Sequence, residues 1–141
     1  MFMGEYNHTV DAKGRLIVPS KFREQLGSEF VVTKGLDGCL FVYPAEEWHN
    51  IEEKFRNISM TSKDARKFSR FFFAGAAAVE LDKQGRILLP PVLREYANLE
   101  GEAHIIGMDT NLEIWNTELW NEENAQYTPE SVAAIMEELN F

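Results

Sequence analysis

The sequence contains few of the residues that covalent and metal chemistry require. Cys39 is the only cysteine among 141 residues, so no intramolecular disulfide can form and folding needs no oxidising compartment. The three histidines, His8, His49 and His104, lie far apart, and none forms a ligand pair with Cys39 at a zinc-site spacing. We therefore expect no bound metal.

The chain also lacks a long hydrophobic run. The longest apolar stretch, around residues 71–79, is much shorter than the roughly 20 residues that a membrane-spanning helix needs. No charged and apolar leader with a small-residue cleavage site is visible at the beginning. We expect a cytoplasmic protein with no membrane partner.

Catalytic motifs are missing as well. There is no Gly-x-Ser-x-Gly nucleophile turn, no Gly-x-x-x-x-Gly-Lys phosphate loop and no Gly-x-Gly-x-x-Gly dinucleotide motif. Cys39 lies in the apolar segment CLFVY, which is typical of a small buried hydrophobe and not of a reactive thiol. We expect no enzymatic activity, no cofactor and no small-molecule substrate.

Basic residues are absent from one end of the chain. Residues 100–141 hold ten acids and no Lys or Arg, whereas residues 1–99 hold all 14 bases and 13 acids. The net charge of −9 therefore describes the last part of the chain more than the body. The acidic segment is either a solvated surface or a means of keeping negative charge away from a phosphate-binding face.

An internal duplication is the main feature that the sequence does have. Residues 10–26 read VDAKGRLIVPSKFREQL, and residues 81–97 read LDKQGRILLPPVLREYA. The similarity extends over most of residues 5–48 and 76–120. The matched residues include Asp11 with Asp82, Gly14 with Gly85, Arg15 with Arg86, Pro19 with Pro90, and Arg23 with Arg94.

Each repeat reads as strand, turn, strand, short helix, strand, turn, strand. Asp at the first and Gly at the fourth position of DAKG and DKQG favour a tight turn, so Asp11, Gly14, Asp82 and Gly85 are expected to form it. The continuous apolar residues 16–18 and 87–89 predict strands buried on both faces. Pro19 and Pro90 suit the first position of a helix.

Helical periodicity fills the rest of the chain. Apolar residues recur at helical spacing over residues 48–58 and, after a Thr61-Ser62 cap, over 65–72; Thr128 and Pro129 predict the start of a last helix. We expect a first repeat at 5–47, linking helices at 48–75, a second repeat at 76–119 and an acidic helical tail at 120–141. Phe71–Phe73 cannot all face one side of a helix, which indicates apolar surface for a partner subunit.

The two turns place cations at their tips. Lys13 and Arg15 lie on the first turn, and Lys83 and Arg86 on the second. Arg can bind phosphate or a guanine edge with two parallel hydrogen bonds. In the alternative interpretation, Asp11 and Asp82 pair with these arginines only to hold the turns. That structural role does not need Lys13 or Lys83. Both interpretations remain open for the Asp–Arg pairs.

The doubled Asp-x-x-x-Arg motif, each copy followed by an apolar strand, Pro and Arg, resembles the MraZ family of bacterial transcriptional regulators. One copy alone would resemble the wider AbrB/SpoVT family of swapped-hairpin DNA-binding proteins. The Met-Phe-x-Gly-Glu-Tyr start is also similar. The resemblance implies an α+β fold, with a β-barrel formed from two AbrB/SpoVT-like hairpin repeats related by a pseudo-two-fold axis and surrounded by helices.

The same resemblance implies the function. Ring-shaped homo-oligomers would bind short direct repeats of double-stranded promoter DNA and repress the division and cell-wall gene cluster, including the regulator's own gene, in the nucleoid. Arg15 and Arg86 would contact the DNA, with Lys13 and Lys83 beside them. Gln84 stands where the first repeat has Lys13, so the two turns need not contribute equally. The alternative is a non-enzymatic protein-binding oligomer, either antitoxin-like or a scaffold.

Overall fold

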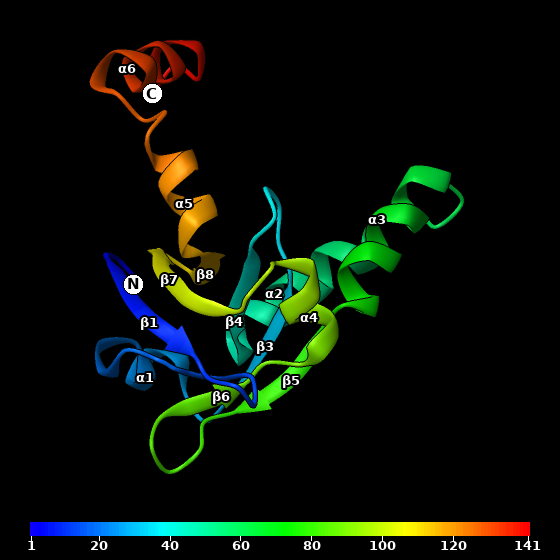
Figure 1. Ribbon diagram of the computed structural model, residues 1–141. Coiled ribbons are helices and arrows are strands. Elements are labelled where there is room, and N and C mark those ends of the chain that lie inside the picture. The colour runs from blue at the N-terminus through cyan, green and yellow to red at the C-terminus, as the bar shows by residue number, and fades with distance from the viewer.

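The computed structural model describes all 141 residues and shows an α+β fold in which one antiparallel sheet carries helices (Figure 1). The elements are β1 (Glu5–Val10), β2 (Arg15–Ile17), α1 (Ser20–Leu26), β3 (Glu29–Lys34), β4 (Leu40–Pro44), α2 (Ala45–Arg56), α3 (Lys63–Ala74), β5 (Ala77–Glu80), β6 (Arg86–Leu88), α4 (Pro91–Tyr96), β7 (Gly101–Met108), β8 (Asn111–Asn116), α5 (Thr117–Asn124) and α6 (Pro129–Glu138). The α+β class predicted from the sequence is confirmed.

The two repeats exchange strands. The six-stranded sheet has the order β1-β7-β8-β4-β3-β5, so the first strand of each repeat pairs with the third strand of the other. The last strands, β4 and β8, pair with each other at the centre. The order reads the same when the two repeats are interchanged, which is the pseudo-two-fold relation expected from the duplication.

The sheet is open, and the predicted closed barrel is not formed. β1 and β5 are the two edge strands and do not pair with each other. β2 and β6 instead form a separate two-stranded ribbon. The two strands hydrogen-bond to each other, and the pairing continues just beyond them, where Val18 N donates to Gly85 O and Leu89 N donates to Gly14 O. The six-stranded sheet and the ribbon are two separate hydrogen-bonded units, so no continuous ring of strands is closed.

The ribbon covers a core that both repeats share. A single cluster of 19 buried residues includes Leu16 and Ile87 from the ribbon, Phe22 and Leu93 from α1 and α4, and Ile105 from the sheet. Because every strand of one repeat pairs with a strand of the other, the two repeats bury their apolar residues together.

Two local predictions need correction. Ile17 and Leu88 are 38% and 59% exposed, so β2 and β6 are not buried on both faces. Side chains alternate along a strand, and only one face of the ribbon lies on the core. Pro19 and Pro90 also precede their helices, which begin at Ser20 and Pro91. Pro19 has an extended ψ of 134°, outside the helical range.

The remaining helices lie outside the sheet. α2 and α3 pack on β3 and β4 through an aromatic cluster that contains Tyr43, Phe55 and Phe72. Ser62 caps α3 by accepting from Ala65 N, and Thr128 caps α6, as expected from the sequence. α5 packs on β7 and β8 through Trp120, whereas α6 buries no residue. No helix has the length and apolar character needed to cross a bilayer.

Candidate nucleic-acid interface

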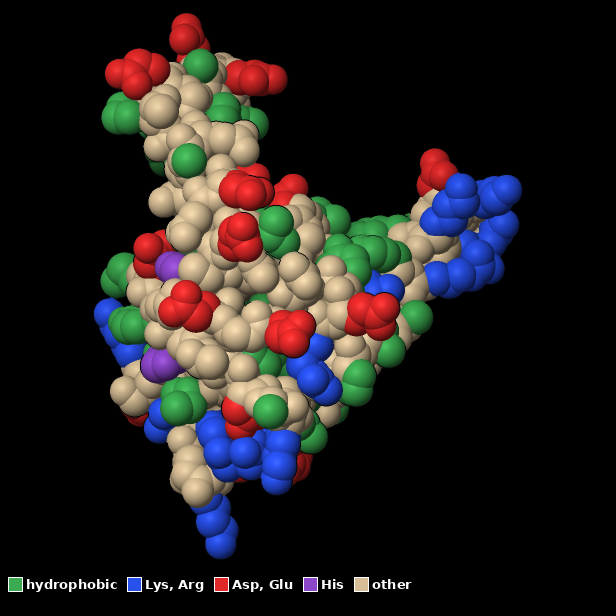
Figure 2. Space-filling model, viewed as in Figure 1, with side chains coloured by type: hydrophobic (Ala, Val, Ile, Leu, Met, Phe, Trp, Pro, Cys, Tyr) green, Lys and Arg blue, Asp and Glu red, His purple; other side chains and the backbone are tan.

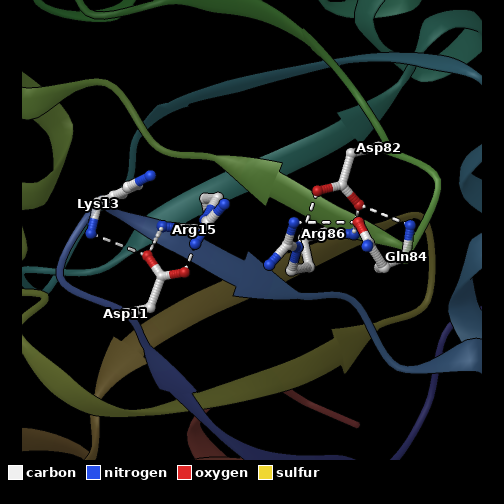
Figure 3. A network of polar contacts seen from close by, with 6 residues as sticks. All are labelled: Asp11, Lys13, Arg15, Asp82, Gln84 and Arg86. Carbon is white, nitrogen blue, oxygen red and sulfur yellow. Dashed lines mark hydrogen bonds and ion pairs between the residues drawn. The ribbon is translucent and has the colours of Figure 1, made fainter.

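The first turn is built around the carboxylate of Asp11 (Figure 3). Its Oδ1 accepts from the backbone N–H groups of Lys13 at 3.0 Å and Arg15 at 2.8 Å, and its Oδ2 accepts from Arg15 Nε at 2.6 Å. Gly14 closes the turn with a φ of +86°, which glycine adopts without strain. The carboxylate thus holds both the backbone and the arginine side chain.

The second turn has the same geometry and one additional bond. Asp82 accepts from Gln84 N, Arg86 N and Arg86 Nε, at 2.9, 2.9 and 2.8 Å. Arg86 Nη2 also donates to Gln84 Oε1 at 3.0 Å. Arg15 has no such partner beyond Asp11, so it keeps more of its guanidinium donors available than Arg86 does.

Both carboxylates stay charged at neutral pH. The backbone N–H of Arg15 lowers the pKa of Asp11, and the backbone N–H of Arg86 lowers the pKa of Asp82, in each case opposed by partial desolvation and assisted by the arginine side chain. Each carboxylate binds its arginine through Nε alone, which orients the guanidinium group. Structural pairing and an outward-facing guanidinium are therefore compatible.

The ribbon brings the two arginines onto one surface. Arg15 pairs with Leu88 and Arg86 pairs with Ile17 across β2 and β6, and residues directly opposite each other point to the same side of a ribbon. Leu16 and Ile87 point to the core, so Arg15, Ile17, Arg86 and Leu88 share the outer face. The apolar members of this surface were missed from the sequence, because the continuous apolar runs hid the alternation.

The exposed lysines lie at the two ends of this surface. Lys13 and Lys83 are exposed at the turns that follow β1 and β5. Figure 2 shows Lys and Arg side chains gathered at the end of the molecule where these turns lie. Glu95 and Glu100 line a hollow beside the first turn, so the cations of one chain are flanked by acids. The positive charge that one chain presents is therefore modest.

Two further arginines lock the turns from the opposite repeat. Arg94 lies over Gly14 and Arg23 lies over Gly85, so closely that a Cβ on either glycine would meet the guanidinium within 3.0 Å. Arg94 Nε donates to Leu89 O and Arg23 Nε donates to Val18 O, at 2.9 and 2.8 Å. The duplication of Arg23 and Arg94 was visible in the sequence, but their partners were not.

The residues considered for other chemistry are buried or scattered. Cys39 is fully buried and its Sγ donates to Leu36 O at 3.0 Å, while burial strongly raises the pKa of its thiol. This confirms Cys39 as a small buried hydrophobe. No group of three or more His, Cys, Asp or Glu side chains is arranged to hold a metal ion.

Comparison with known proteins gives full-length matches. The family model "MraZ protein, putative antitoxin-like" matches twice, at residues 1–71 and 72–139. Curated relatives, each named "Transcriptional regulator MraZ", include those of Thermoanaerobacter sp. (strain X514), 55% identical over 100% of both chains, and Carboxydothermus hydrogenoformans, 58% identical over 96% of both. The relative from Desulforamulus reducens is 59% identical over 89% of both chains.

These matches confirm the resemblance seen in the sequence. The family is one of non-enzymatic regulators, which also confirms the expectation drawn from the missing catalytic motifs. Two repeats that each match the family model, together with full-length relatives more than half identical, show that this chain belongs to the MraZ family of transcriptional regulators.

Proposed function

We propose that this protein binds double-stranded DNA through the outer face of the β2–β6 ribbon and the two Asp-anchored turns. Arg15 and Arg86 contact base edges or phosphates, and Lys13 and Lys83 contact the backbone on either side. The observation that carries the proposal is the pair of arginines on one ribbon face, each oriented by a carboxylate through Nε with Nη groups left over.

The shape of this surface suits duplex DNA. A two-stranded ribbon fits the major groove, and Arg can donate to guanine O6 and N7 at once. The carboxylates and the ribbon restrict both arginines before binding, so little side-chain entropy remains to be lost. Ile17 and Leu88, exposed between the arginines, are placed to contact thymine methyl groups.

The proposed target is a set of short direct repeats in a promoter, bound by a ring-shaped homo-oligomer in the nucleoid. Because one chain presents only modest positive charge, affinity has to come from several subunits that bind linked sites. Binding of this kind would repress the division and cell-wall gene cluster that includes the regulator's own gene. The duplicated surface supports this interpretation, since every subunit brings two turns to the DNA.

DNA affinity measured over a salt series tests the proposal. The wild type, Arg15→Ala, Arg86→Ala and the double variant are titrated with the protein's own upstream DNA and with random duplex. We expect the affinity of each single variant to fall at least about fivefold, since one bidentate arginine contact is worth about 1–3 kcal/mol. The double variant should bind neither DNA. The slope of log affinity against log salt should become shallower by about 0.9 for each phosphate that is no longer bound.

Matched variants separate a specific surface from general charge. Lys21→Ala removes an exposed base on α1, outside the ribbon and its two turns, and should leave affinity unchanged. Gln84→Lys releases Arg86 and adds a base, so it should tighten binding. Arg15→Ala should cost more than Arg86→Ala, because Arg15 has more free donors. Normal binding by the double variant, or a complex insensitive to salt, would favour the protein-binding alternative.

A further inference from the structure

Helix α6 is amphipathic and has nothing packed on it. Val132, Ile135, Met136 and Leu139 follow the spacing of one helix face, and their exposure ranges from 38% to 71%. None of the ten residues of α6 is buried. A helix of this length is marginal in water without tertiary contacts, even with a good cap. The apolar stripe therefore requires a partner.

The charge of this end of the chain restricts the partner. Residues 117–141, which contain α5 and α6, include six acids and no base. Glu130, Glu137 and Glu138 lie on α6 itself, on the face away from the apolar stripe, since they stand four residues before and three and four residues after Ala134. A matching surface has to be apolar where it meets the stripe and part of a region whose overall charge is positive.

The same chain carries such a surface on the arm formed by α2 and α3. An apolar groove of about 190 Å³ lies between these helices and the strands β3 and β4, with Lys34 and Lys54 at its edges. Leu36 and Phe68 in this groove are 62% and 50% exposed. Its apolar lining is formed by Leu36, Phe41, Tyr43, Ile51, Phe55, Ile58, Phe68, Phe71 and Phe72.

The arm around the groove is basic. Residues 54–70 hold six bases and one acid, which is the opposite of the last part of the chain. Figure 2 shows these Lys and Arg side chains gathered on the projecting end of α3, with hydrophobic side chains next to them, and acidic with hydrophobic side chains at the α6 end. Charge and hydrophobicity are therefore complementary between two surfaces of one chain.

We propose that α6 of one copy docks, by its apolar stripe, in the α2–α3 groove of a second copy, where the basic arm attracts the acidic segment of residues 117–141. This is helix-in-groove recognition, with anchors at positions i, i+3, i+4 and i+7. In Figure 1 α6 and the α3 arm project from different sides of the body, so the contact is made between copies.

The contact joins two different surfaces, so it is head-to-tail. Such contacts either close into a ring or continue as a filament. The inference deepens the proposed function, because it identifies the surfaces by which the proposed DNA-binding assembly is held together. Each copy donates one α6 and accepts another, which leaves the β2–β6 ribbon outside the contact.

Paired α6 variants test the inference on the full-length chain. Ile135→Glu places an acid in the stripe, and Ala134→Glu places the same acid on the other side of the helix. Light scattering over a concentration series should show that Ile135→Glu raises the dissociation concentration at least tenfold, while Ala134→Glu assembles like the wild type. Equal behaviour of the two variants, or a wild type that stays monomeric, would overturn the proposal.

Mixing two defective chains tests the head-to-tail geometry. Leu36→Glu blocks the groove and keeps α6, whereas Ile135→Glu keeps the groove; both positions are exposed, so both chains should keep the melting temperature of the wild type. Each alone should be monomeric. Together they should form a one-to-one dimer that cannot grow, because only one intact groove and one intact helix remain. No pairing, or a tail that docks on its own groove, would contradict the inference.

DNA titrations of the same chains keep this inference separate from the proposed function. A monomeric wild type that still binds promoter DNA through Arg15 and Arg86 would overturn the α6 contact and leave the DNA-binding surface standing. The opposite result is also informative. If Ile135→Glu disrupts assembly but Arg15→Ala and Arg86→Ala leave DNA affinity unchanged, the α6 contact is supported and the proposed function is overturned.

Discussion

The turn glycines meet two separate requirements at the scale of single residues. Gly14 has a φ of +86°, a region that L side chains rarely adopt, and the guanidinium of Arg94 lies directly over it. Arg94 is held there by its hydrogen bond to Leu89 O. A side chain at residue 14 therefore strains the backbone and also displaces an arginine that the other repeat supplies.

Gly14→Ala should consequently destabilise the protein more than Gly38→Ala. Gly38 has a φ of +83° and open space where a Cβ would be, so its substitution costs only the positive-φ conformation, about 1–2 kcal/mol. Gly14→Ala should cost about 1–3 kcal/mol more, since the bond from Arg94 to Leu89 O is broken as well. Urea unfolding measures both. Equal destabilisation would mean that Arg94 moves aside freely.

Helix α3 is tied to the sheet at the scale of elements by one buried polar contact. Thr33 on β3 is fully buried, and its Oγ1 donates to Phe72 O at 2.7 Å. Phe72 lies in the last turn of α3, where carbonyl groups have no partner within the helix. The hydroxyl thus fixes the C-terminal end of α3 to the sheet. The basic residues lie toward the other, projecting end of the same arm.

Thr33→Val should loosen this arm. The substitution keeps the volume but leaves the carbonyl of Phe72 buried without a donor, which costs about 1–3 kcal/mol. Thr33→Ser keeps the hydroxyl and serves as the control. In hydrogen exchange, amides of α3 should lose protection in Thr33→Val more than amides of α1, whereas Thr33→Ser should show no such difference. Loss of α3 protection in Thr33→Ser but not in Thr33→Val would show that the methyl group, not the hydroxyl, holds the arm.

The exchanged strands make the whole molecule one cooperative unit. The edge strand β1 pairs only with β7 of the second repeat, and the edge strand β5 pairs only with β3 of the first repeat. The core cluster likewise draws on both repeats. Neither repeat can lose its structure without exposing the apolar residues of the other, so two matches to the family model do not mean two folding units.

Core truncations in either repeat should therefore shift the same transition. Leu16→Ala and Ile87→Ala remove equivalent, almost fully buried side chains, and each should cost about 2–5 kcal/mol. Calorimetry is best done in the Ile135→Glu background, where assembly does not add a concentration dependence. One peak is expected, with equal calorimetric and van't Hoff enthalpies. Two transitions, each sensitive to one substitution, would contradict a shared unit.

Features that depend on neighbouring residues could be predicted from the sequence. The turn at Asp11–Gly14, the Ser62 cap of α3 and the Thr128 cap of α6 involve residues only a few positions apart, so the spacing of Asp, Gly, Ser and Thr was sufficient. The duplication and the family followed from residue identities alone. The contact of Arg15 and Arg86 with DNA remains a prediction.

Tertiary packing decides whether a strand or a turn is contacted by residues of its own repeat or of the other repeat. A hairpin of given sequence can pair within its repeat or across to the other, and the local pattern is the same in both cases. For this reason the open sheet and the arginines over Gly14 and Gly85 could not be predicted from the sequence. The exposure of Ile17 and Leu88 has the same cause, since an apolar run does not reveal whether the core covers one face of a strand or both.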